Sequence, residues 1–160
     1  MNKEDILQLL DSKNIKYEIE NHKAVYNMEE LKDINLLYPE SDAKNLFLRD
    51  DKKRNYYLVS VKGDKKVDLK EFKNKNNTRS LSFASDDDLF NILGLTPGSV
   101  TPLGLLNDKD NRVIFYLDSY FKDKIIGVHP NDNTSTLWLN SNDLINIIEE
   151  KGNSCIIIDM

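Results

Sequence analysis

Lys44 is the first residue of this sequence whose type and position could do chemistry. It stands in residues 43–49, where positions 44, 46 and 48 share one face of an extended strand with two leucines. A lysine on an apolar face either runs its stem along that face to reach water, or holds its ammonium for an anionic or carbonyl-bearing ligand. Local sequence leaves both interpretations open.

Two loops offer further candidates. The segment Gly98-Ser99-Val100-Thr101-Pro102 combines a glycine, which lets the backbone approach a ligand, with a proline that fixes the backbone path. Such a loop can present N–H groups to a carbonyl oxygen, although it could also be an ordinary helix-to-strand connection. Residues 129–136 place His129 between two expected strands, and a polar turn is the alternative to a binding role there.

Several common kinds of active site lack their sequence signature. One cysteine and two histidines without paired spacing argue against a metal site. No phosphate-binding loop, dinucleotide fingerprint or Gly-x-Ser-x-Gly elbow occurs, so we expect no nucleotide cofactor and no serine hydrolase. Cys155 lies in an apolar run with no cationic neighbour, which indicates a packing residue rather than a nucleophile.

The charge of the chain is unevenly distributed. The net charge is −5, but residues 44–79 carry 12 Lys or Arg against 5 Asp or Glu, a net of +7. This basic segment predicts an anionic partner, or alternatively only a soluble surface. The 39% hydrophobic content argues against disorder. We expect no membrane span and no signal peptide, and the single cysteine fits the reducing cytoplasm.

The elements that must position these candidates are typical of one α+β domain over residues 1–160. Periodicity and capping predict a first helix at the N-terminus, a second from Met28, a short one at Leu69 and Phe72, and two more at 85–94 and 140–152. The expected strands are 17–21, 43–49, 56–61, 81–83, 113–117, 125–128, 136–139 and 155–158. Residues 96–104 should be irregular. Hairpin-length turns favour a single mixed, twisted β-sheet flanked by helices.

Taken together, the three candidate segments resemble the YbaK/prolyl-tRNA-editing family, in particular its free-standing ProX-type branch. The likeness runs from about residue 6 to residue 158, and the matching residues include Lys44-Asn45, Gly98 to Gly104, His129-Pro130, Asn133 and Thr136. The resemblance implies a trans-editing deacylase that hydrolyses the ester joining a wrong amino acid to the 3′ end of tRNA(Pro). Alanine is the expected amino acid; cysteine, another aminoacyl-tRNA, or a non-catalytic regulatory binder of charged tRNA or amino acid are the alternatives. Water would attack with help from the substrate's own ribose hydroxyl, without metal or cofactor.

The resemblance also implies which residues form the site. Lys44 and Gly98 are expected to be catalytic, Lys44 by holding the 3′-terminal nucleotide or aminoacyl end, and the glycine loop by stabilising the oxyanion with its N–H groups. The expected substrate-binding residues are Asn45, Ser99, Val100, Thr101, Pro102, Leu103 and His129. Val100 and Leu103 would form the wall that excludes proline, as a second sieve. The stretch around His22 departs from the family pattern, so His22 receives no role.

The resemblance also suggests a role for the basic segment, residues 44–79. Its side chains are expected to hold the phosphates of the acceptor stem, and they are Lys52, Lys53, Arg54, Lys62, Lys65 and Lys66. The expected partners are the acceptor end of mischarged tRNA(Pro) and prolyl-tRNA synthetase. DNA and membranes are not expected partners.

Overall fold

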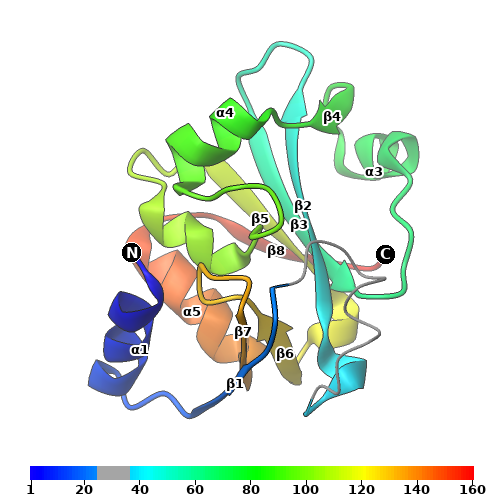
Figure 1. The fold of residues 1–160 in the computed structure, drawn as a ribbon. Helices are drawn as coiled ribbons and strands as arrows, with labels where there is room; N and C mark the ends of the chain where they lie inside the picture. The colour runs from blue at the N-terminus through cyan, green and yellow to red at the C-terminus, as the bar shows by residue number, and fades with distance from the viewer. Residues whose placement is uncertain (25–36) are drawn as a thin grey trace.

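The strands in the described part of the chain form two sheets (Figure 1). The computed structural model describes residues 1–24 and 37–160. The larger sheet has the strand order β4-β2-β3-β5-β8 and the smaller has the order β1-β7-β6. The strands are β1 Tyr17–Asn21, β2 Ala43–Asp50, β3 Tyr56–Lys62, β4 Leu81–Phe83, β5 Val113–Asp118, β6 Ile125–Val128, β7 Ser135–Asn140 and β8 Cys155–Ile158. Each predicted strand is present to within one residue at either end, and the α+β class is confirmed. The strands are divided between two sheets, of which the larger is mixed.

The two sheets meet at a single point. The larger sheet is mixed, since β2 pairs antiparallel with β3 and β4, whereas β5 runs parallel to β3 and β8. The smaller sheet is antiparallel. Between them, only an isolated bridge joins Asp42 to Gly127 within the described residues. A 3₁₀ turn, Pro39–Ser41, immediately precedes that bridge, so β2 starts at Ala43 and pairing with β6 does not continue. This seam sets the start of β2 beside the end of β6.

The β2–β3 hairpin is built by the chemistry of its turn. The Asp50 carboxylate accepts hydrogen bonds from the Arg54 backbone N–H at 2.9 Å and from Asn55 Nδ2 at 2.8 Å. Lys53 takes a left-handed conformation, with φ of 54°. In Figure 1 this turn is at the top of the molecule, far from the small sheet at the bottom. The predicted hairpin is therefore confirmed, and its turn lies away from the seam.

The helices cover the two sheets from different sides. In the described residues they are α1 Lys3–Ser12, α3 Leu69–Asn76, α4 Asp86–Asp88 with a π-helical continuation Leu89–Leu93, and α5 Ser141–Lys151. The predicted caps Ser85 and Asn140 both accept hydrogen bonds from the first turn of their helices. The helix expected from Met28 lies outside the described residues. No helix of the described chain is long and apolar enough to span a membrane.

One expectation about the loops needs correction. Residues 96–104 were expected to be irregular throughout, but Pro102–Asn107 forms a 3₁₀ helix. Thr101 caps it, since its hydroxyl accepts the Leu103 N–H at 3.3 Å, and Pro102 fits the first turn because it has no N–H to satisfy. The irregular part of the loop is therefore limited to the residues before Pro102.

Alternation along β2 separates its two functional candidates. Ala43 and Phe47 belong to a core cluster that also holds residues of α1, α5 and the small sheet. Leu48 belongs to a second cluster, which includes Phe72 of α3 on the other face of the larger sheet. Because successive side chains of a strand point to opposite faces, Asn45 faces the first cluster and Lys44 faces the second.

Candidate active site

A small pocket opens at the seam between the sheets. It is lined by Asp42, Ala43, Asn45, Gly127, Val128, His129 and Thr136. The start of β2, the end of β6 and β7 each contribute to this wall. The space inside it is about 10 Å³, close to the room needed by one water molecule, so a substrate group must displace side chains to enter.

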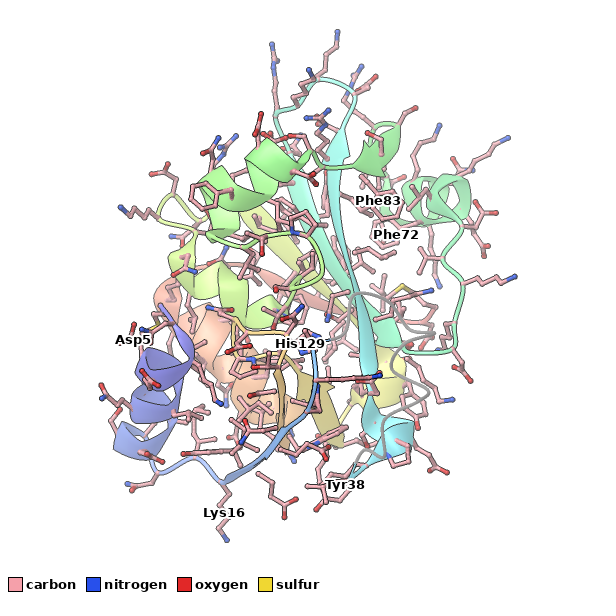
Figure 2. The ribbon with its side chains drawn as sticks, in the orientation of Figure 1. Asp5, Lys16, Tyr38, Phe72, Phe83 and His129 are labelled. Carbon is pink, nitrogen blue, oxygen red and sulfur yellow. The ribbon has the colours of Figure 1, made fainter. Side chains whose placement is uncertain are left out.

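His129 is held in one orientation. Its Nδ1 lies 2.9 Å from the Ser135 carbonyl oxygen, which can only accept, so Nδ1 carries the proton. Burial lowers the pKa of His129, although the Ser135 carbonyl works in the opposite direction; nearby His22 lowers the pKa further. The imidazole is therefore neutral at pH 7 and keeps Nε2 as a hydrogen-bond acceptor. Figure 2 shows His129 and Phe72 on opposite sides of β2 and β3 in that view.

The glycine loop is hydrogen-bonded to β2 and to the residue that follows β6. Asn45 Nδ2 donates to the Val100 carbonyl at 3.3 Å, and the Thr101 hydroxyl donates to the His129 carbonyl at 2.6 Å. Gly98 has φ of 89°, a conformation that glycine adopts without strain. The structure thus brings together Asn45, the loop and His129, three segments that are far apart in the sequence.

The loop also has free backbone donors. The Ser99 N–H donates to the Thr96 carbonyl at 3.1 Å, which closes a turn. Over residues 1–24 and 37–160, the N–H groups of Gly98 and Val100 have no acceptor. Of the other predicted pocket residues, Thr101 and Leu103 have no exposed surface, while Ser99 and Pro102 are buried. None of these four residues lines the seam pocket, and neither does Gly98 or Val100. The proposed wall role of Leu103 and Val100 stays a prediction.

Asn45 has a partner that sequence reasoning missed. The fully buried Ser60 hydroxyl donates to Asn45 Oδ1, and the two residues face each other in the β2–β3 register. With both ends of its amide engaged, Asn45 has a fixed direction toward the loop. A serine inside the apolar run 56–61, opposite Asn45 in a hairpin, is the signal that could have found it.

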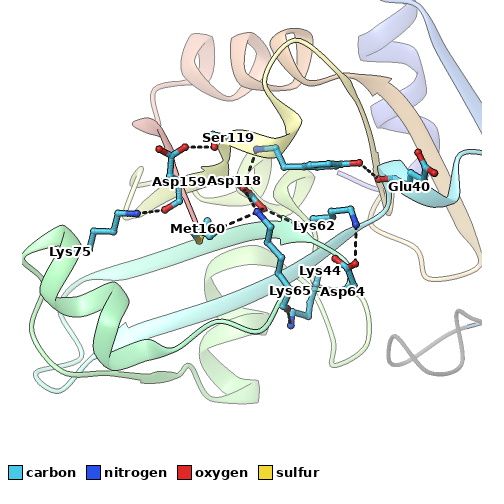
Figure 3. A network of polar contacts seen from close by, with 11 residues as sticks. Glu40, Lys44, Lys62, Asp64, Lys65, Lys75, Asp118, Ser119, Asp159 and Met160 are labelled. Atoms are coloured by element: carbon cyan, nitrogen blue, oxygen red, sulfur yellow. Dashed lines mark hydrogen bonds and ion pairs between the residues drawn. The ribbon is translucent and has the colours of Figure 1, made fainter.

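Lys44 lies elsewhere. Its Nζ donates to the Lys65 carbonyl oxygen, in the loop that follows β3 (Figure 3). Lys65 in turn forms an ion pair with the fully buried Asp118 at 2.8 Å and donates to the Met160 carbonyl at 2.9 Å. Lys44 is not among the residues that line the seam pocket. In this structure its ammonium and His129 are not brought together, so its catalytic role stays a prediction.

The basic segment is split between the two ends of the hairpin. Lys52, Lys53 and Arg54 are exposed in the turn beyond β2, a strand of eight residues, and therefore roughly 25 Å from Lys44 at ~3.3 Å per residue. The others lie at the Lys44 end, and these are Lys62, paired with Asp64 at 2.9 Å, Lys65 and the exposed Lys66. Only the second group lies near Lys44.

An aromatic ring that the sequence analysis did not select joins this second group. The ammonium groups of Lys62, Lys65 and Lys124 lie 5.3, 5.9 and 4.4 Å from the centre of the Tyr120 ring. These distances are typical of cation–π contacts. Lys124 and Tyr120 therefore extend the basic surface at the Lys44 end of the hairpin.

Asp42 and His22 are the other residues that sequence reasoning missed or left without a role. The Asp42 side chain is buried, and burial raises its pKa to about 7, although the Ala43 N–H opposes the shift. His22 Nε2 lies 2.8 Å from the Thr136 hydroxyl, and the His22 and His129 ring centres are 6.4 Å apart. Nothing in the local sequence marks Asp42, because its burial depends on the distant Gly127.

The structure also bears on metal binding and on thiol chemistry. In the described ranges there is no group of three or more Cys, His, Asp or Glu that could hold a metal ion. Cys155 is half-buried in β8, and burial raises the pKa of its thiol to about 12. The thiol is therefore protonated at pH 7, in agreement with the packing role expected for it.

The sequence is similar to a family of editing domains and to curated proteins over nearly their full length. The family model for the aminoacyl-tRNA editing domain matches residues 22–147. The prolyl-tRNA editing protein ProX of Acetoanaerobium sticklandii is 39% identical over 159 residues, which cover 99% of this chain and 97% of that protein. The mouse prolyl-tRNA synthetase associated domain-containing protein 1 is 31% identical over 160 residues, covering 97% of this chain and 94% of its own.

Solved structures share the fold at low sequence identity. The hypothetical protein APE2540 superposes with a TM-score of 0.71 at 14% identity, over 96% of this chain and 97% of its own. A candidate trans-editing enzyme for prolyl tRNA synthetase superposes with a TM-score of 0.69, also at 14% identity, over 98% of this chain and 94% of its own.

Proposed function

This chain belongs to the aminoacyl-tRNA editing domain family and is an aminoacyl-tRNA deacylase, and we propose that it removes alanine from mischarged tRNA(Pro). The observation that carries the proposal is that Asn45 and His129, which both line a small pocket, are hydrogen-bonded to the glycine loop beside it. The relative named as a prolyl-tRNA editing protein supports the choice of tRNA. Residues 1–160 would act as one editing domain in the cytoplasm, on tRNA charged by prolyl-tRNA synthetase.

The proposed reaction is hydrolysis of an ester. The oxygen of a water molecule adds to the carbonyl carbon of the alanyl group, and the bond from that carbon to the ribose oxygen then breaks. A proton of the water passes to the ribose oxygen, so the products are free alanine and tRNA with a free terminal hydroxyl. The neighbouring ribose hydroxyl of the substrate orients the water, which leaves the protein to position the ester.

The protein's part follows from fixed groups in the pocket and in the glycine loop beside it. The free N–H groups of Gly98 and Val100 are the proposed donors to the developing oxyanion, and Asn45 holds the Val100 peptide in place. The neutral His129 offers Nε2 as an acceptor for the ribose hydroxyl or the water. Lys44 would leave the Lys65 carbonyl to bind the terminal phosphate of the tRNA.

The size of the pocket supports alanine as the amino acid. A site that must admit a larger group cannot strongly reject a smaller one, because one methylene is worth only ~1–3 kcal/mol. A pocket this small reverses the problem, since it must open to admit any side chain and the proline ring needs more room than the alanine methyl group. The deacylase would then spare correctly charged tRNA(Pro).

A panel of charged tRNAs tests the proposal. Ala-tRNA(Pro), Cys-tRNA(Pro), Pro-tRNA(Pro) and Ala-tRNA(Ala) are each incubated with the protein, and the remaining ester is measured against a blank. We expect Ala-tRNA(Pro) to lose its amino acid fastest and Pro-tRNA(Pro) to match the blank. Faster loss of cysteine would move the substrate to Cys-tRNA(Pro), and tight binding without loss of any amino acid would replace the enzyme by a regulatory binder.

A further inference from the structure

Asp42 presents an unsatisfied carboxylate to the seam pocket. Only 8% of the residue is exposed, and it lines the pocket together with Asn45 and His129. Its backbone is fully used, because its carbonyl accepts the Gly63 N–H at 3.0 Å and the residue bridges to Gly127. In contrast, its buried Oδ2 has no hydrogen-bond partner among the described residues. Buried polar atoms in this state are rare in proteins and call for an explanation.

The described residues around the pocket offer Asp42 no cation. None of the seven lining residues is Lys or Arg. The polar neighbours are already engaged: the Asn45 amide with Ser60 and Val100, His129 Nδ1 with Ser135, and the Thr136 hydroxyl with His22. The Ala43 N–H forms a hydrogen bond to this carboxyl, but a buried carboxylate without a cation is still unfavourable by several kcal/mol. A positive group that arrives with the ligand would satisfy it and keep it ionised.

An aminoacyl ester carries such a group close to its reacting atom. The α-ammonium is attached to the carbon next to the ester carbonyl, so a carboxylate in the pocket can hold it while the carbonyl faces the glycine loop. We propose that Asp42 Oδ2 binds the α-ammonium of the aminoacyl group and thereby orients the ester in the pocket. This inference rests on the proposed function. It assigns Asp42 a direct contact with the substrate, through a charge-assisted hydrogen bond.

The same contact adds to the discrimination against proline. The α-ammonium of an alanyl ester has three N–H donors, whereas the secondary ammonium of a prolyl ester has two and carries a ring carbon in place of the third. A prolyl group that turned a donor toward Asp42 would have to fit its ring beside Gly127 and Val128, which line the same small pocket. Charge and shape therefore select the same substrate.

A cycle of two proteins and two substrates tests the contact. The unchanged protein and Asp42→Asn are each assayed on Ala-tRNA(Pro) and on N-acetyl-Ala-tRNA(Pro), whose acetyl group removes the positive charge. We expect Asp42→Asn to reduce kcat/KM for the alanyl ester roughly 10- to 100-fold, the range for a charge-assisted hydrogen bond. For the acetylated ester, the two proteins should differ less than about threefold. Glu40→Gln, an exposed carboxylate two residues away, is the matched control and should leave both rates unchanged.

With an active enzyme, any other outcome of this cycle overturns the assignment. If Asp42→Asn slows both esters equally, Asp42 acts on the water or on the pocket's shape; if it slows neither, it makes no contact. If the unchanged protein hydrolyses none of the esters, the proposed function is refuted instead. In that case, binding of 3′-alanylamino-3′-deoxyadenosine and its N-acetyl form decides separately: weaker binding of only the first to Asp42→Asn supports the contact, and equal binding by both proteins refutes it. Circular dichroism confirms that the variant is folded.

Discussion

Asp42→Asn is expected to stabilise the protein increasingly as the pH rises. The pKa of the buried Asp42 carboxyl is about 7 in the folded protein, compared with 3.8 for an ordinary aspartate. Between these values the folded state binds more protons than the unfolded state, so the free energy of unfolding falls as pH increases. Asparagine has nearly the same shape and does not titrate, so the variant lacks this pH-dependent decrease in stability.

The magnitude follows from the shift. A difference of about 3 pH units at ~1.36 kcal/mol per unit amounts to roughly 4 kcal/mol between pH 4 and pH 8. Between pH 5 and pH 8 the difference in stability between the variant and the unchanged protein should grow by roughly 3 kcal/mol. For a chain of this length that corresponds to a relative rise in Tm of roughly 6–12 °C.

Urea denaturation of both proteins at several pH values measures the effect. The lowered pKa of His129 acts with the opposite sign, since its contribution to stability is lost as pH falls through 6.5 and below, but both proteins share it and it cancels in the difference. Ser82→Ala, at an exposed position whose side chain does not titrate, is the control and should give a difference that does not vary with pH. A difference between Asp42→Asn and the unchanged protein that is constant within about 0.5 kcal/mol over pH 5–8 would refute the buried, ionisable carboxylate.

Three further predictions concern the loop and the basic surface. Ser60→Ala removes the hydrogen bond to Asn45 Oδ1 and should reduce kcat for Ala-tRNA(Pro) about tenfold. Ser82→Ala, on the exposed edge strand, is the control and should leave kcat unchanged. Equal kcat values for the Ser60 variant and the unchanged protein would show that the Ser60 hydroxyl does not position the loop. Gly98→Ala places a side chain at φ of 89° and should lower the free energy of unfolding in urea by about 1–2 kcal/mol. Gly63→Ala is the control at a position without positive φ. Equal urea midpoints for Gly98→Ala and the unchanged protein would contradict the loop conformation. Replacing Lys52, Lys53 and Arg54 together by alanine should reduce the slope of log KM against log salt by about 0.9 for each phosphate that these side chains neutralise, and an unaltered slope would limit tRNA binding to the Lys44 end of the hairpin.

Local patterns predicted the strands well because their causes are local. Alternating residues, the Asp50-to-Asn55 turn and the caps Ser85 and Asn140 act over a few residues, so the sequence contains the whole cause. The division into two sheets was not predictable in this way. It depends on Asp42 meeting Gly127, two residues separated by more than half of the chain, and no local pattern encodes that pairing.

The site shows the same division between local and distant causes. The order of the motifs predicted that Asn45, the glycine loop and His129 form one site. In the structure, the hydrogen bonds of Asn45 and Thr101 join these three segments. Neighbours in a motif are not neighbours in space, however: Lys44 and Asn45 are adjacent but face different cores. Asp42, which no motif includes, enters the pocket only because the two sheets meet beside it.

The most direct test of the account is a single-turnover time course of alanine release from Ala-tRNA(Pro). With protein in excess over tRNA, we expect first-order loss of the ester at least about tenfold faster than in the blank, since the fixed N–H donors stabilise the oxyanion. Asn45→Ala, which removes the hydrogen bond to Val100, should return the rate most of the way to that of the blank. Release at the blank rate by the unchanged protein, under conditions where it binds the tRNA, would contradict the central claim that this pocket hydrolyses the alanyl ester.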